Sequence, residues 1–181
     1  MKLDNLDFTP HADTLVAVVL GALLATISGF AATLMENWFK RRERERDSAL
    51  FFGELFSSLD VILQAAKGAR GRGEPYGPLT MRMLRVARRE LDMYDRNRAG
   101  LYDLRDGALR TAVHSLVVRM TIPIDGLIEG IGSSNDARDA GFGFLMESHA
   151  EIAPLVDRLG RIARHSFAGY ADAARGSRFP G

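Results

Sequence analysis

The chain has 181 residues, a formal net charge of +1 and no cysteine. The near-neutral charge gives no general attraction to nucleic acid, and the lack of cysteine excludes disulfides and thiolate chemistry. Strand patterns are weak throughout, while apolar residues recur at helical spacing, so the sequence predicts an all-α fold. After residue 35, about 140 residues remain, which is the size of one ordinary domain.

An uncharged segment near the N-terminus, residues 14–35, predicts a transmembrane helix. A helix of this length reaches about 33 Å, and the hydrocarbon core of a bilayer is about 30 Å thick. Thr9-Pro10 is a suitable helix start, with Thr as cap and Pro at the first helical position. The alternative, a cleaved signal peptide, is disfavoured because the apolar run is too long and acidic residues precede it.

The basic residues around the span predict its direction. Lys2 is the one Lys or Arg before the span, whereas five follow it within a few residues. The positive-inside rule then places the C-terminal domain in the cytoplasm and the N-terminus outside, across a bacterial inner (plasma) membrane. The residues predicted to lie at the interface and contact lipid headgroups are Trp38, Lys40, Arg41, Arg42, Arg44 and Arg46.

Small residues recur at every fourth position within the span. They are Ala17, Gly21, Ala25, Gly29 and Thr33. Such a row lets two helix backbones approach closely, so it predicts transmembrane packing, either in a homo-oligomer or with another subunit of a membrane complex. Because membrane spans are rich in Ala and Gly in general, composition alone is the competing explanation.

The later sequence predicts that the transmembrane helix continues into a cytosolic, antiparallel four-helix bundle. The predicted bundle helices are 48–68, 79–97, 103–131 and 141–174. Polar residues in 103–131 argue against a second span, Pro123 predicts a kink, and Pro154 predicts a kink or break. The resulting division is an extracytoplasmic segment 1–13, the span 14–35, a basic juxtamembrane helix 36–47, the bundle 48–174 and a loose tail 175–181.

Charge is segregated along the bundle sequence. Residues 67–98 hold nine basic and four acidic residues, whereas 99–160 hold five basic and nine acidic residues. The basic residues predicted to form a face for an anionic partner are Arg82, Arg85, Arg88 and Arg89. The alternatives are lipid headgroups and a solvated face that pairs with the acidic helices. Nucleic acid is not expected, because aromatic residues are not interleaved with the arginines.

The sequence contains no recognisable catalytic motif, and it predicts no enzyme, no cofactor, no metal site and no small-molecule substrate. Glu147 and Glu151 flank His149, but they do not both share a helix face with it, as a carboxylate-bridged metal site would require. His149 is therefore predicted to be a hydrogen-bonded core or rim residue, with a pH-sensing role as the alternative.

Several short motifs follow the span: Trp38 with Lys40-Arg41-Arg42, and Tyr94-Asp95-Arg96-Asn97 followed by Leu101 and Leu104. With the N-terminal span and the amphipathic helix, they resemble a loose group of uncharacterised bacterial single-pass membrane proteins. This resemblance implies a cytosolic helical region after the span and transfers no catalytic or binding residues.

Together these patterns predict a non-enzymatic, bitopic scaffold or accessory subunit that presents a helical bundle to a cytosolic partner. The alternative is a membrane-active effector or toxin that oligomerises and perturbs the bilayer. A third hypothesis, an enzyme with an unrecognised site, would require a pocket with convergent polar groups between the helices.

Overall fold

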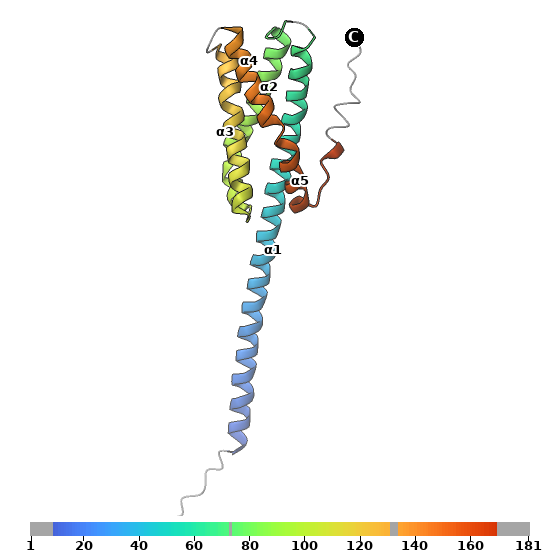
Figure 1. Cartoon of the computed structure of the whole chain (residues 1–181). Coiled ribbons are helices and arrows are strands. Elements are labelled where there is room, and N and C mark those ends of the chain that lie inside the picture. Colours follow the sequence, from blue (N-terminus) through green and yellow to red (C-terminus); the bar gives the residue numbers. More distant parts are fainter. Residues whose placement is uncertain (1–8, 73, 131–133, 170–181) are drawn as a thin grey trace, which may run out of the picture. The chain divides into compact units, whose positions relative to one another are not determined.

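A computed structural model describes residues 9–72, 74–130 and 134–169, with side chains from residue 16 onward. These residues are helical with no strand among them, which confirms the predicted all-α class (Figure 1). The chain divides into two compact units, Met1–Arg42 and Glu43–Gly181. Helix α1 (Thr9–Arg70) contributes to both units, and the predicted tail 175–181 lies outside the described residues.

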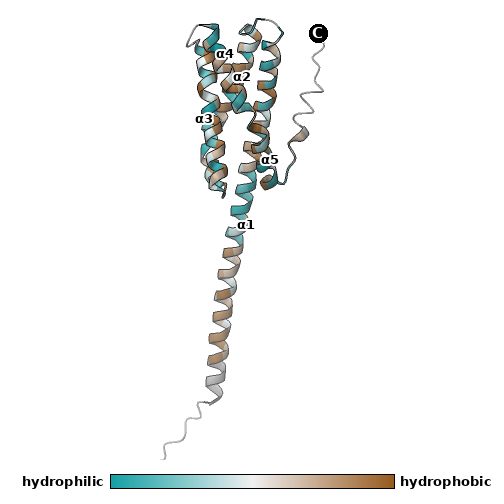
Figure 2. Ribbon diagram, viewed as in Figure 1, coloured by the Kyte–Doolittle hydropathy of each residue, from teal (hydrophilic) through white to brown (hydrophobic). Residues whose placement is uncertain are grey.

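The first unit consists of the first half of α1, which begins at the predicted start, Thr9. Much of this part of the helix is coloured as hydrophobic in Figure 2, and its large apolar residues from Val16 to Met35 are exposed. The predicted juxtamembrane segment 36–47 straddles the boundary between the two units.

The second unit, here called the bundle, holds residues 43–70 of α1 and all later helices. These are α2 (Pro78–Asn97), the short 3-10 helix η1 (Arg98–Asp103), α3 (Gly107–Glu129), α4 (Asn135–His149) and α5 (Ile152–Ala163). Helix α3 packs against α2, α4 and α5. Helix α1 supplies a buried stripe at spacings of three and four that includes Phe52, Phe56, Leu59 and Leu63. One side of each helix is therefore apolar, as a bundle core requires.

Two of the described helices, α1 and α3, are long and apolar enough to cross a membrane. They differ in where their apolar side chains lie. In α3, Leu109, Leu116 and Ile124 are buried in the bundle core, whereas the apolar window of α1 has no buried residue. Most of the large apolar side chains of α3 are thus packed within the bundle, although Val118 and Ile122 are exposed. Helix α3 continues without interruption through the buried Pro123.

Two helix starts differ from those predicted, and side-chain caps explain both. Helix α3 starts at Gly107 rather than at residue 103, because the Asp106 carboxylate accepts hydrogen bonds from the amides of Ala108 and Leu109. Helix α4 starts at Asn135 rather than at residue 141, because the Ser134 hydroxyl accepts one from the amide of Ala137. Each cap satisfies amides that have no partner within the helix.

The last predicted helix, 141–174, is broken in its described part, and residues 170–174 lie outside the described residues. Helix α4 ends at His149, and α5 begins at Ile152, so the break precedes Pro154. Pro154 lies in the first turn of α5, where a missing N–H costs no helical hydrogen bond. Helix α5 ends at Ala163, because Arg164 adopts a left-handed conformation with φ of 52°.

Three polar residues, Arg70, Tyr76 and Asp139, join the connection between α1 and α2 to α4 and are here called the clasp. The Tyr76 hydroxyl and the Arg70 guanidinium both donate to Oδ1 of Asp139, each at 2.6 Å. The Arg70 guanidinium also lies 4.7 Å from the centre of the Phe142 ring. The clasp therefore links a surface loop to the helix that closes this end of the bundle.

Candidate functional site

Residues 16–35 of α1 expose uncharged side chains on all sides, with most of the large apolar side chains on one broad face and small residues on the other. The large exposed apolar side chains are Val16, Val18, Val19, Leu20, Leu23, Leu24, Ile27, Phe30, Leu34 and Met35. Monomeric soluble proteins rarely expose a continuous apolar surface of this kind. A lipid environment would satisfy these side chains without help from any other part of the chain.

The predicted row of small residues lies on this exposed part of α1. Ala17, Gly21, Ala25, Gly29 and Thr33 are all exposed, and no atom lies within 4 Å of a Cβ built on Gly21 or Gly29. The Thr33 hydroxyl donates to the Gly29 carbonyl at 2.9 Å, so it brings no unpaired donor into an apolar environment. Because a row at spacing four is inclined to the helix axis, a second helix following it would cross α1 rather than run parallel to it.

The predicted interfacial residues form a small network at the end of the span. The rings of Trp38 and Phe39 meet edge to face at 5.1 Å, and the Arg42 guanidinium lies 4.5 Å from the centre of the Trp38 indole. Lys40 pairs with Glu36 at 2.6 Å, and this hydrogen bond lowers the pKa of the Glu36 carboxyl. Aromatic rings and cations in this arrangement are typical of a membrane–water interface.

Arg46 belongs to the bundle as well as to the predicted interfacial set. Its Nε donates to the Ala163 carbonyl at the end of α5, at 3.0 Å. Arg41 and Arg44 are exposed. Sequence spacing did not reveal the role of Arg46, because its partner is 117 positions away.

The structure divides the predicted basic face of α2. Arg82, Arg85 and Arg89 are exposed, whereas Arg88 is half-buried between two carboxylates. Nε of Arg88 donates to Asp125 on α3 at 2.7 Å, and another guanidinium nitrogen pairs with Asp92. Arg88 therefore joins α2 to α3 and is not available to an external partner.

His149 lies at the rim of the bundle, next to a carboxylate on α1. Its Nε2 is 2.7 Å from Oδ1 of Asp60, although the two groups are not aligned as a hydrogen bond. Glu151 is engaged elsewhere, in a two-pronged pair with Arg119 that lowers the pKa of its carboxyl. Among the described residues, no three His, Cys, Asp or Glu side chains are placed to share a metal ion.

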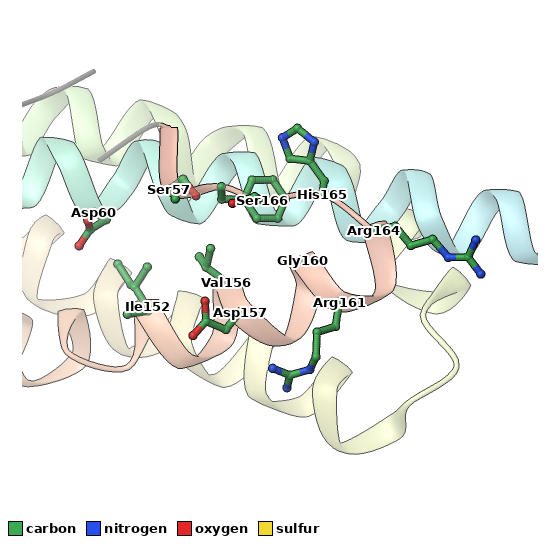
Figure 3. A pocket seen from close by; sticks show the side chains of 13 residues that line it. Ser57, Asp60, Ile152, Val156, Asp157, Gly160, Arg161, Arg164, His165 and Ser166 are labelled. Carbon is green, nitrogen blue, oxygen red and sulfur yellow. The ribbon is translucent and has the colours of Figure 1, made fainter. Parts of the chain in front are cut away.

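A cavity of about 670 Å³ lies between α1, α5 and the segment after α5 (Figure 3). Ile152 and Val156 point into it from α5, and Ser57 and Asp60 border it on α1. The Ser57 hydroxyl already donates to the Gly53 carbonyl at 2.8 Å. The lining is therefore mixed: apolar side chains lie beside charged residues of both signs, which include Asp157 and Arg161 as well as Asp60.

Phe167 closes one side of this cavity by packing over two glycines. Its ring is 6% exposed, and a Cβ on Gly53 would overlap it. A Cβ on Gly160 would lie 2.8 Å from the His165 carbonyl oxygen. The sequence analysis missed this contact, although a glycine within the apolar stripe of α1 was a signal of close approach.

The comparisons with known proteins add no relative: no family model, curated protein or solved structure matches this chain.

Proposed function

We infer that this protein is a bitopic membrane protein in which residues 14–35 anchor a cytosolic antiparallel helical bundle. Its role is that of a non-enzymatic scaffold or accessory subunit. The observation that carries this proposal is the contrast within α1: residues 16–35 expose uncharged side chains on every side, while its second half buries a single stripe. A lipid bilayer is the solvent that accepts the first pattern.

The basic residues after the span support the orientation with the N-terminus outside. Five of them lie between residues 40 and 46, and Lys2 alone precedes the span. The rings of Trp38 and Phe39 mark the cytosolic interface in this proposal.

The small-residue row supports self-association, or pairing with another span of a membrane complex. Exposure of all five residues and the open space around Gly21 and Gly29 leave room for a second helix. Membrane helices associate by such close backbone contact, since lipid removes the hydrophobic driving force between them.

Crosslinking in native membranes tests this proposal. Gly21→Leu and Gly29→Leu should abolish crosslinked oligomers, because each adds a bulky side chain to the row. Ala31→Leu is the matched control, since Ala31 lies on the opposite side of α1 from Gly29. Two results would overturn the proposal that the small-residue row mediates association. One is a protein that is monomeric in the native form and in every variant, and the other is oligomers that persist in both glycine variants.

A further inference from the structure

The outward face of α2 carries two interleaved rows of side chains, each with a seven-residue repeat. One row is basic, Arg82, Arg89 and Arg96, and the other is apolar, Leu79, Val86 and Met93. Successive members of the combined set alternate spacings of three and four, which is the spacing of a coiled-coil seam. The seam lies opposite the buried side of α2, and from Leu79 to Arg96 it extends over about 26 Å.

The seam is exposed in the part of the chain that the structure describes. Leu79 is 54% exposed and Met93 is 43% exposed, while Val86 is half-buried. Arg82, Arg89 and Arg96 are exposed, and none of them forms an ion pair with a described acidic side chain. Arg85 flanks the same side.

Charge selects the kind of partner that fits this seam. A second copy of the same face would set arginines against arginines if the helices ran parallel, and arginines against apolar side chains if they ran antiparallel. Neither arrangement pairs the arginine charges. A helix with apolar residues opposite Leu79, Val86 and Met93 and carboxylates opposite the arginines is complementary at both rows. Arginine also pairs with carboxylate in a two-pronged geometry that favours defined registers.

The surroundings of Met93 argue against a membrane or nucleic-acid partner. Met93 borders a shallow groove of about 210 Å³ between α1 and α2, together with Glu54 and Glu90. These carboxylates would repel phosphate groups, whereas a helix can place a basic residue over them. Three apolar side chains in a single line are also too narrow a face for insertion into a bilayer.

We propose that α2 is the docking helix for an acidic amphipathic helix of a different protein, which the Leu79–Met93 and Arg82–Arg96 rows recognise. The proposal rests on the proposed function in one respect, namely that the bundle is the part presented to a partner.

A binding titration tests the proposal with the full chain in detergent or nanodiscs at low ionic strength. The probe is a synthetic helical peptide of about three heptads. In each heptad, Leu occupies the position that faces the apolar row of α2, and Glu occupies the position that faces the arginine row. The triple variant Arg82→Gln, Arg89→Gln and Arg96→Gln should weaken binding at least tenfold. The matched control removes the same charge at three exposed arginines outside α2: Arg72→Gln, Arg161→Gln and Arg164→Gln.

Two further readouts separate this recognition from general attraction of polyanions. Met93→Gln should weaken binding of the Leu-containing peptide and leave binding of a Glu peptide without Leu unchanged. Any binding of the chain to anionic vesicles or to duplex RNA should not depend on the three α2 arginines. Equal loss in both triple variants, no peptide binding by the native chain, or vesicle or RNA binding through the same arginines would overturn the proposal. Membrane retention, measured on the same variants, reports separately on the proposed anchor.

Discussion

The two halves of α1 are built from similar apolar residues but place them in different environments. From residue 16 to residue 35, uncharged side chains, large or small, are exposed on every side of the helix. After residue 48, Phe52, Phe56 and Leu59 are confined to one stripe and are fully buried. The comparison teaches that the width of the apolar surface, rather than hydrophobicity as such, distinguishes a lipid-facing helix from a bundle helix. Helix α3 agrees with this lesson, because most of its large apolar residues, including Leu109, Leu116 and Ile124, face the core, although Val118 and Ile122 are exposed.

The comparison predicts a large difference between two Leu→Ala substitutions on the same helix. Leu59→Ala removes a fully buried side chain and should destabilise the bundle by about 2–5 kcal/mol. Leu23→Ala changes an exposed side chain in the first half of α1 and should leave bundle stability unchanged. Pulse proteolysis in detergent measures both, and equal destabilisation would contradict the separation of the two regions.

A charge within the first half of α1 should have the converse effect. Leu24→Arg places a cation near the middle of the span, at a cost of about 2.5–3.5 kcal/mol to membrane insertion. Carbonate extraction should release a larger fraction of this variant than of Leu24→Phe, while proteolysis of the bundle stays as in the native chain. Full retention of Leu24→Arg would argue that lipid does not surround this residue.

Two Gly→Ala substitutions sharpen the comparison further. Gly53→Ala forces the Phe167 ring to move and should lower the free energy of unfolding of the bundle by about 1–3 kcal/mol. Gly29→Ala should leave this free energy unchanged, because a Cβ at Gly29 meets no atom within 4 Å. Phe167→Ala should remove most of the penalty at Gly53, so the double variant should be clearly non-additive. Additive effects would show that the ring does not lie over Gly53.

The smallest expected effect is a pH dependence that belongs to the bundle. The hydrogen bond from Tyr76, with a further contribution from Arg70, lowers the pKa of Asp139, so its stabilisation is lost as pH falls below the unfolded value of 3.8. Burial, aided by Asp139, raises the pKa of Tyr76 to about 12, so its stabilisation is lost as pH rises from 10. Tyr76→Phe should flatten the alkaline loss relative to the native chain in pH-dependent denaturation. An unchanged alkaline slope would contradict the clasp.

Local patterns in the sequence predicted helix type and the apolar stripe of α1, because both depend on residues three and four positions apart. The helix starts that follow Asp106 and Ser134 could also have been predicted, since each residue is a preferred cap. Contacts between residues far apart in the sequence could not be predicted in this way. Spacing alone could not show that Arg88 turns towards Asp125, or that Phe167 packs over Gly53, 114 positions earlier.

The central claim is that residues 14–35 cross the membrane with the bundle in the cytosol. Since the chain has no cysteine, single-cysteine labelling in intact cells tests it directly. A membrane-impermeant maleimide should label Asn5→Cys in intact cells and Ala153→Cys only after lysis. Labelling of Ala153→Cys in intact cells, or a protein found in the soluble fraction, would contradict the account.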